Sequence, residues 1–500
     1  MRIGLEVFGL QSRSRHRGIG RYVKNLVSHL LAQNDQDEFI LYAQEDLTTE
    51  LVPTASNACL KFLKPIGHDG ESTMLDALAR QARANPDALD VLGVLNPLEM
   101  CPSRNLPARP LKRLPMVAVV YDVIPFAFRD DCLPDLQSAS RFYRRLMTLR
   151  HYDGLAAISE STRHDFATLL NLPSERIANI RCASDPTFFS PATETAEDRR
   201  TLKAMNLTKP FVLTIGTHQG HKNLKGLIAA FGKLPESIRV GHQLAVVGGM
   251  WEIDPKQLED LCREHGVFDQ LVITDRVTDE TLRLLYRRCT AYVSPSLYEG
   301  FGLPVLEAMH CAAAVLAGRN SSQIEVVGEA GLLADATDPD DLARQLGRIL
   351  GDRSFAASLR TKAPIHAAQF RWSDTALRFH DLLKQVVTNP IDVKGRSRVA
   401  LIVPSEEHPD LEPLARELAR FTQVDLYHEA GRVPHFALGD ATFGRHNIRI
   451  LAKHAEMLDI TILDPFGVSD RFALPDHFRV DRPTISLRGP HLTSVREHSR

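Results

Sequence analysis

The sequence predicts an α/β protein with two doubly wound, Rossmann-like domains that face a cleft, followed by a smaller C-terminal α/β unit. The main observation is alternation, because short apolar runs are separated by amphipathic stretches of helical length. Such alternation is typical of parallel sheets with helices on both faces. The pattern restarts near Phe211, and a chain of 500 residues exceeds what one hydrophobic core holds.

In the first domain, placed at residues 1–190, the apolar runs are short and are expected to be buried strands. These strands are Phe39–Tyr42, Val91–Val94, Met116–Tyr121 and Gly154–Ile158, after a first strand that begins at the N-terminus. Apolar residues recur at helical spacing in Arg21–Ala32 and Gln137–Arg150. These two stretches are expected to be helices between the strands.

The second domain, placed at residues 205–388, repeats the pattern. Its expected strands are Phe211–Ile215, Gln243–Val247, Leu271–Thr274, Ala291–Ser294 and Ala314–Ala317. The stretch from Pro186 to Pro210 carries few strand signals and is interpreted as the linker between the domains. The second domain is expected to end with the helix Thr375–Val387, for which Ser373 is the predicted N-cap.

A third unit, placed at residues 396–500, follows a linker that is marked by Pro390 and Gly395. Its expected elements are the strands Val399–Val403, Val424–Tyr427 and Ile460–Leu463 and the helix Leu411–Phe421. We interpret this order as the start of a further α/β domain.

Composition and charge exclude several classes of protein. Hydrophobic residues at 44% and charged residues at 24% are ordinary for a globular protein, and a net charge of −2 does not indicate nucleic-acid binding. The seven cysteines form no Cys-x-x-Cys pair, so neither a zinc site nor a disulfide framework is indicated. The N-terminus lacks a signal-peptide core, and no apolar run has the roughly 20 residues of a spanning helix. We therefore expect a cytoplasmic protein, with peripheral contact at the inner membrane face as an alternative.

The most informative segment is residues 294–309, where a strand end, a glycine loop and an amphipathic helix follow one another. Glu299 and Glu307 lie eight positions apart, with Gly300 and Gly302 between them. The glycines allow the backbone to approach a ligand, and the helix start offers free N–H groups to an anion. Glu299 can reach a hydroxylated group, and Glu307 can accept from a diol. Phosphate, sugar and ribose together describe a nucleotide sugar, whereas the alternative is an ordinary turn before a helix.

The residues from Tyr298 to Met309, followed by those from Ser321 to Leu333, closely resemble the donor-site signature of retaining family-4 glycosyltransferases. The resemblance implies the two-domain GT-B fold, in which the last helix crosses back to the first domain; residues 375–387 are the candidate. It also implies that Glu299 positions the sugar and that Glu307 binds the ribose. The other residues expected at the donor from this segment are Gly300, Phe301, Gly302 and Leu303.

A second glycine loop lies near the N-terminus, where Gly18 and Gly20 open the first helix. Backbone N–H groups there could face a diphosphate, although a tight strand-to-helix turn gives the same pattern. The pentapeptide that starts at Gly18 is similar to the glycine loop of family-4 mannosyl- and rhamnosyl-type transferases. The nearby Arg13, Arg15 and Arg17 either hold an acceptor or phosphate or form a solvated basic loop.

The first strand of the second domain ends at Gly216, and His221 and Lys222 follow before the next helix. A fixed cation is suited to neutralise a departing diphosphate, so Lys222 is predicted to have that role. Gly216 and His221 are expected beside it at the nucleotide. The family usually has arginine at position 221, and some relatives have arginine where this chain has Thr217. Both departures weaken the positive charge at the diphosphate, because threonine is uncharged and histidine titrates near neutral pH.

Asp122 follows the strand Met116–Tyr121, and strand ends face the cleft in doubly wound folds. It is predicted to bind an acceptor or donor hydroxyl and to act with Glu299 and Lys222 as a catalytic residue. Capping of its own loop is the alternative.

A basic amphipathic helix holds four arginines, namely Arg141, Arg144, Arg145 and Arg150. This helix either contacts anionic lipid or a lipid-diphosphate acceptor, or it is a solvated helix face.

The predicted function is transfer of a hexose from a nucleotide diphosphate sugar to a glycan or polyprenyl-diphosphate-linked acceptor. GDP-mannose is the favoured donor, and a UDP-linked sugar is the alternative. The resemblance implies retention of configuration without an essential metal ion, and neither a cofactor nor a nucleic-acid partner is expected. Two other hypotheses are a catalytically weak scaffold or partner subunit, and a sugar-nucleotide epimerase or phosphorylase on the same fold. The third unit resembles the start of a second transferase module, but no second Glu-x7-Glu pair follows it.

Overall fold

The computed structural model describes residues 1–16, 18–64, 74–98, 114–133, 135–216, 220–248 and 255–389, and the backbone of five strands beyond residue 397. Contacts divide the chain into two units. Unit 1 comprises residues 1–158, 163–180 and 376–500, and unit 2 comprises residues 159–162 and 181–375. Along the chain, three separate sheets form in order, and every strand pair in them is parallel.

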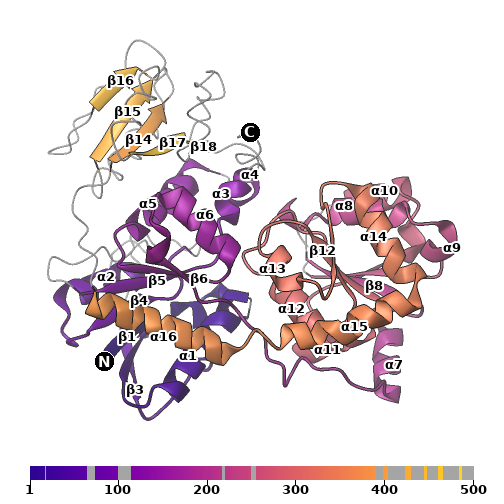
Figure 1. Cartoon of the computed structure of the whole chain (residues 1–500), viewed down its shortest axis with the longest axis horizontal. Coiled ribbons are helices and arrows are strands. Elements are labelled where there is room, and N and C mark those ends of the chain that lie inside the picture. Colours follow the sequence, from indigo (N-terminus) through magenta and orange to yellow (C-terminus); the bar gives the residue numbers. More distant parts are fainter. Residues whose placement is uncertain are drawn as a thin grey trace. The chain divides into compact units, whose positions relative to one another are not determined.

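Unit 1 contains a sheet of seven strands in the order β3-β2-β1-β4-β5-β6-β7 (Figure 1). The strands are β1 (Arg2–Glu6), β2 (Glu38–Gln44), β3 (Ala58–Leu63), β4 (Val91–Val94), β5 (Met116–Val120), β6 (Gly154–Ala157) and β7 (Ile177–Asn179). The central strands β4, β5 and β6 are buried along their whole length. Continuous apolar runs are expected there, because helices cover both faces of a parallel sheet.

The helices before Ile180 connect these strands, as crossovers between parallel strands require. They are α1 (Gly18–Gln33), α2 (Met74–Ala84), α3 (Ile124–Ala127), α4 (Arg129–Cys132), α5 (Leu136–Leu149) and α6 (Glu160–Leu170), with short turns of 3-10 helix at Phe8–Leu10, Arg13–His16 and Ser174–Arg176. In the basic stretch, Arg145 of α5 and Arg150, directly after this helix, are 2% and 6% exposed. These two arginines are therefore buried in unit 1 rather than part of a solvated or lipid-facing surface, and the side chains of Arg141 and Arg144 lie outside the described residues.

The last long helix, α16 (Trp372–Thr388), starts in unit 2 and continues in unit 1, where it lies on the first sheet (Figure 1). A Cβ atom on Gly154 would lie 3.0 Å from Leu382, so a glycine in β6 lets the helix approach closely. His380 is buried and its Nε2 lies 2.5 Å from Asp37 of unit 1. The predicted N-cap was wrong, because the helix begins at Trp372, one residue before Ser373.

Unit 2 contains six strands in the order β10-β9-β8-β11-β12-β13. They are β8 (Phe211–Ile215), β9 (Gln243–Val247), β10 (Leu271–Thr274), β11 (Ala291–Ser294), β12 (Val315–Gly318) and β13 (Leu332–Ala334). The helices are α7 (Ala196–Ala204), α8 (Leu224–Gly232), α9 (Glu236–Arg239), α10 (Pro255–Glu264), α11 (Asp279–Arg288), α12 (Leu303–His310), α13 (Gln323–Val327), α14 (Pro339–Gly351) and α15 (Arg353–Ala367), with 3-10 turns at Gly220–Lys222 and Phe268–Gln270.

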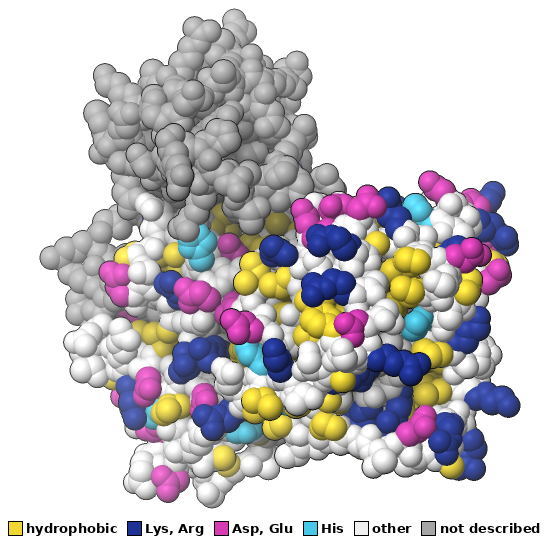
Figure 2. Space-filling view, turned by 45° about the vertical axis from the view of Figure 1, so that its right-hand side comes forward, with side chains coloured by type: hydrophobic (Ala, Val, Ile, Leu, Met, Phe, Trp, Pro, Cys, Tyr) yellow, Lys and Arg dark blue, Asp and Glu magenta, His cyan; other side chains and the backbone are white. Residues whose placement is uncertain are grey.

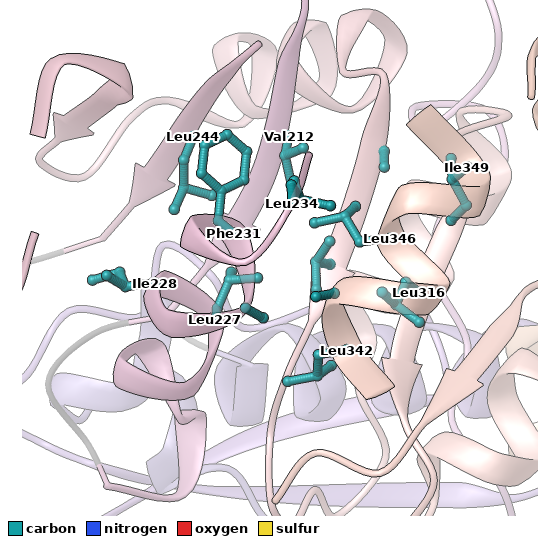
Figure 3. Packing of buried hydrophobic residues seen from close by; sticks show 14 of the residues in the cluster. Val212, Leu227, Ile228, Phe231, Leu234, Leu244, Leu316, Leu342, Leu346 and Ile349 are labelled. Carbon is teal, nitrogen blue, oxygen red and sulfur yellow. The ribbon is translucent and has the colours of Figure 1, made fainter. Parts of the chain in front are cut away.

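The core of unit 2 lies between the sheet and the helices α8 and α14 (Figure 3). Leu227 and Phe231 project from α8, and Leu342 and Leu346 project from α14, toward strand residues such as Leu244. Each of these side chains is at least 99% buried. The close-packed layer fixes the sheet edge from which the loops after β8 and β11 emerge.

The segment before α7 is held to unit 2 by three arginines of α11. The guanidinium of Arg283 lies 4.4 Å from the ring centre of Phe188, and Arg287 donates to the carbonyl of Ser190 over 2.5 Å. Arg288 pairs with a carboxylate of α7 at 2.9 Å. The stretch interpreted as a linker therefore packs on the second sheet's helices, and unit 2 begins at residue 181.

The third sheet has the order β16-β15-β14-β17-β18. Its strands are β14 (Arg398–Val403), β15 (Gln423–His428), β16 (Gly444–Asn447), β17 (Ile460–Asp464) and β18 (Thr484–Ser486). Numbered within each sheet, the order 3-2-1-4-5 is common to all three sheets. The predicted helix Leu411–Phe421 and the linker marked by Pro390 and Gly395 lie outside the described residues.

Charged and apolar side chains are mixed on the one face of the molecule that Figure 2 draws, where basic side chains are dispersed among acidic ones. None of the helices in the described ranges is both long enough and apolar enough to cross a bilayer.

Candidate active site

The loop between β11 and α12 forms the centre of the site. Gly302 precedes α12 in the left-handed conformation, with φ of +94°, which glycine adopts without steric cost. Pro304 follows in the first turn of the helix, where its missing N–H is not needed. Phe301 is buried and packs edge-on against Phe370, with ring centres 5.7 Å apart. The loop is therefore anchored beside a helix start that offers backbone N–H groups to an anion.

Glu299 forms a buried ion pair with Lys222. The Lys222 Nζ atom lies 2.7 Å from Glu299 Oε1, and Ser296 Oγ donates to the same oxygen over 2.7 Å. The two charged side chains are 23% and 12% exposed. Burial by itself raises the pKa of the Glu299 carboxyl, but Lys222 and Ser296 outweigh that effect, so the pKa lies below its ordinary value. The carboxylate is therefore ionised at neutral pH.

Lys222 is placed by the turn that follows β8. Gly216 has φ of +151°, and a Cβ atom there would lie 3.3 Å from the Lys222 side chain, so glycine leaves room for the lysine stem. His221 is buried, and its carbonyl accepts from the backbone N–H of Leu297 over 2.7 Å. The structure thus brings Gly216, His221 and Lys222 to the loop of Glu299, as expected if one ligand uses both segments.

Asn223 completes this junction, and the sequence analysis missed it. It caps α8 from the left-handed region, with φ of +53° and its side chain accepting from the N–H of Gly226. Its Nδ2 atom donates to the carbonyls of Pro295 at 3.1 Å and Ala336 at 2.6 Å. An asparagine directly before a predicted helix was the available signal, because asparagine favours the N-cap and tolerates positive φ.

Glu307 lies in α12 and is 4% exposed. The hydroxyl of Tyr286, a fully buried residue of α11, donates to Glu307 Oε2 over 3.0 Å. Burial, and next the nearby carboxylate of Glu307, raise the pKa of Tyr286 well above its ordinary value, so the tyrosine is a permanent donor. Tyr286 therefore orients Glu307. Sequence reasoning missed it, because a tyrosine 21 positions away carries no local signal.

We expect Tyr286→Phe to weaken nucleotide binding, since Glu307 loses the hydroxyl that orients it. A hydrogen bond to a charged group contributes about 1.5–3 kcal/mol, which corresponds to roughly a 10- to 150-fold weaker Kd for GDP. Calorimetric titration measures the effect. Tyr292→Phe is the matched control, because Tyr292 is buried as well and packs on Tyr286, with ring centres 5.5 Å apart, whereas Glu307 Oε2 accepts from the Tyr286 hydroxyl. Equal affinities of the two variants would contradict this role of Tyr286.

The predicted residues of the first domain lie in unit 1. Gly18 starts α1, and Gly20 packs against the backbone of Arg15, where a Cβ atom would collide. The Asp122 carboxylate accepts from the N–H of Ile124 over 2.9 Å at the start of α3. These contacts agree with the structural alternatives for the glycines and Asp122, and their roles at the nucleotide or acceptor stay predictions. Thr217, Arg17 and the side chain of Arg13 lie outside the described residues.

The described residues hold no group of three or more His, Cys, Asp and Glu side chains that is arranged for a metal ion. What the site offers instead is one cation, one helix N-terminus, the partly buried carboxylate of Glu299 and the buried carboxylate of Glu307, all within unit 2. Such a set can bind a diphosphate and hydroxyl groups together.

The segment that contains this site is similar to known proteins. Residues 196–366 match the family model of glycosyl transferases group 1. The chain is 27% identical over 495 residues to the serotype-specific mannosyltransferase WbdA of Escherichia coli. This alignment covers 93% of this chain and 55% of WbdA. It is 35% identical over 225 residues to the O-antigen chain mannosyltransferase B of Escherichia coli, covering 44% of this chain and 57% of that protein. The chain thus spans about half the length of the curated relatives that it matches.

Solved structures support the fold. A sucrose-phosphate synthase from Thermosynechococcus elongatus superposes with a TM-score of 0.59 at 21% identity, over 78% of this chain and 99% of that one. Anabaena HepE in complex with UDP and glucose superposes with a TM-score of 0.57 at 16% identity. The superposition covers 77% of this chain and 100% of that one. The prediction of two Rossmann-like domains of the GT-B type is confirmed by this likeness and by the two sheets. The domain at residues 196–366 is therefore similar in sequence to the glycosyl transferases group 1.

Proposed function

We propose that the protein transfers a mannosyl residue from GDP-mannose to a hydroxyl of a glycan or lipid-linked glycan, with retention of configuration. The observation that carries the proposal is the ion pair of Lys222 and Glu299 beside the glycine-rich start of α12. The mannosyltransferase names of the matched relatives favour mannose over other hexoses.

In the proposed reaction, the bond between the anomeric carbon and the diphosphate breaks while negative charge grows on the diphosphate. Lys222 and the N-terminus of α12 stabilise that charge, because fixed cations and oriented N–H groups act most strongly where charge develops. Glu299 holds a sugar hydroxyl, and Glu307 accepts from the ribose. The acceptor hydroxyl attacks the face that the diphosphate leaves, and its proton passes to a phosphate oxygen of the departing group.

A nucleotide screen followed by a transfer assay tests the proposal. We expect GDP to raise the unfolding midpoint more than UDP, dTDP or ADP, since a ligand at 100 times its Kd adds roughly 2.7 kcal/mol to stability. We expect GDP-mannose to be consumed when a mannosyl glycan acceptor is present. Stabilisation by another nucleotide alone would contradict the donor, and binding without transfer to any acceptor would favour the scaffold hypothesis.

The third sheet belongs to this proposal as the start of a second transferase module. Its strand order repeats that of the first five strands of unit 1's sheet. The match to WbdA covers 93% of this chain, whereas residues 1–388 are 388 of 500, so the similarity extends past α16. The proposed cytoplasmic location and the contact with a lipid-linked acceptor rest on the reaction class alone.

We expect a chain ended after Thr388 to fold and to bind GDP with unchanged affinity. Every residue of the candidate donor site lies before that point, and the third sheet pairs only with itself. Calorimetric titration of the short and full chains decides the matter. A soluble, folded short chain that binds more than about tenfold more weakly would place the third unit in the donor site.

A further inference from the structure

A short segment before α13 holds the loop that carries Glu299. The backbone N–H of Glu299 donates to Ser321 Oγ over 2.9 Å, and the Glu299 carbonyl accepts from Ser322 Oγ over 2.9 Å. Two consecutive hydroxyls thus fix both backbone groups of one residue. Ser322 is fully buried, so its bond does not compete with water.

The segment is itself bound to the same loop by two amide side chains. Asn320 Nδ2 and Gln323 Nε2 each donate to the carbonyl of Ser296 over 2.9 Å. The Ser321 hydroxyl donates to Asn320 Oδ1 over 2.9 Å while it accepts from Glu299. Donors and acceptors follow one direction through this network, so each hydroxyl has one orientation.

The network determines which carboxylate oxygen is available to a ligand. Glu299 Oε1 already receives the Lys222 ammonium and the Ser296 hydroxyl. Across the described part of the chain, Glu299 Oε2 makes no hydrogen bond that meets normal geometry. Once the backbone is fixed on both sides, rotation of the side chain is limited by the two bonds to Oε1. Oε2 is then the oxygen that a sugar hydroxyl meets.

The backbone of Ser321 gives a second, independent observation. Ser321 has φ of +43°, in the left-handed region that serine adopts only at a cost. Glycine would occupy this position without strain. The hydroxyl that glycine lacks is the group that binds the N–H of Glu299.

We propose that Ser321 and Ser322 are positioning residues that hold Glu299 so that its Oε2 atom binds a hydroxyl of the transferred sugar. This inference rests on the proposed function, because it assigns the sugar to Glu299. The nucleotide moiety, held by Lys222, Glu307 and the helix start, does not depend on the two hydroxyls.

Two variants of the full chain test the proposal. Ser322→Ala and Ser321→Gly are each expected to lower kcat for transfer from GDP-mannose by roughly 10- to 100-fold, since misplacement of a reacting group by about 1 Å has effects of that size. The Kd for GDP alone should stay within about twofold. Ser321→Gly removes backbone strain as well as the hydroxyl, so its unfolding midpoint should stay within about 5 °C of the parent while turnover falls. If Ser321 had only a structural role, the unfolding midpoint and the turnover would fall together.

Two controls accompany these variants. Ser322→Thr retains a hydroxyl and should recover most of the lost turnover. Ser358→Ala removes a serine hydroxyl that also donates to a carbonyl, in α15, and should leave turnover unchanged. Parental kcat in Ser321→Gly would overturn the proposal even if Ser322→Ala failed to fold. Glu299→Ala separates the two hypotheses: if it still transfers sugar, the assignment of Glu299 fails, and if it is inactive while both serine variants are normal, only the positioning role fails.

Discussion

Glu299→Ala should abolish sugar transfer, with a loss of roughly 10³-fold or more, while the protein stays folded. The expected size follows from losing both the contact that orients the sugar and the preorganised geometry around it. GDP should bind as tightly as before or more tightly, because Lys222 no longer shares its charge with a carboxylate 2.7 Å away. Steady-state transfer from GDP-mannose and calorimetric titration with GDP measure the two effects.

The control for this variant is Glu236→Ala, since Glu236 is an exposed glutamate of the same unit, in α9. It removes the same charge without touching the loop, and its turnover should match that of the parent. Turnover near the parental rate in Glu299→Ala would refute the assignment. Loss of GDP binding in that variant would instead show that Glu299 serves the nucleotide rather than the sugar.

Lys222→Ala is expected to reduce turnover by roughly 10²–10³-fold, the usual cost of removing a group that stabilises developing negative charge. It should also introduce a pH dependence. In the parent, Lys222 overcomes the effect of burial and holds the pKa of Glu299 below its ordinary value, so the carboxylate is ionised well into the acid range. Without Lys222, burial dominates and the pKa of Glu299 rises.

The sign of the pH effect follows from the direction of that shift. A carboxyl whose pKa is lowered by folding contributes stability above its unfolded pKa, and that stability is lost as the pH falls through the folded value. In Lys222→Ala the remaining turnover should therefore begin to fall at a higher pH than in the parent, because Glu299 takes up a proton more readily once its pKa has risen. Lys233→Ala, on an exposed surface pair with Asp340, is the control and should change neither rate nor profile. A flat profile in Lys222→Ala would contradict the electrostatic role.

The sequence predicts the fold well where strands are buried on both faces. The predicted run Met116–Tyr121 corresponds to β5 at Met116–Val120, and Phe211–Ile215 coincides with β8. The edge strand β3 was missed, because its residues are mostly half exposed and give no continuous apolar run. The helix α15 was missed as well, since Pro364 lies inside it and proline normally signals a break.

In the candidate site, too, local patterns could be predicted from the sequence, whereas contacts between distant residues could not. Glu299 and Glu307 could be predicted, because their spacing across a glycine loop is a local pattern. Lys222 was predicted as well, as the cation for the diphosphate. Its contact with Glu299, and that of Ser321, could not be predicted by spacing, since they lie 77 and 22 positions from Glu299. Pairs of this kind depend on which strand ends meet at one edge of the sheet. Burial of Arg145 was missed for a related reason, because helical spacing shows which residues share a face but not what covers it.

The arginines of α11 also define where chimeric enzymes should be joined. Exchange of unit 2 between relatives would test whether this unit selects the sugar, as the proposed donor site requires. A junction placed near residue 205 would separate Phe188 from Arg283 and Phe189 from Tyr286, although the latter rings lie 6.0 Å apart in one packed cluster. Recombination at residue 181 keeps each such pair within one parent, so hybrids joined there should retain the packing of Phe189 on the tyrosine that orients Glu307.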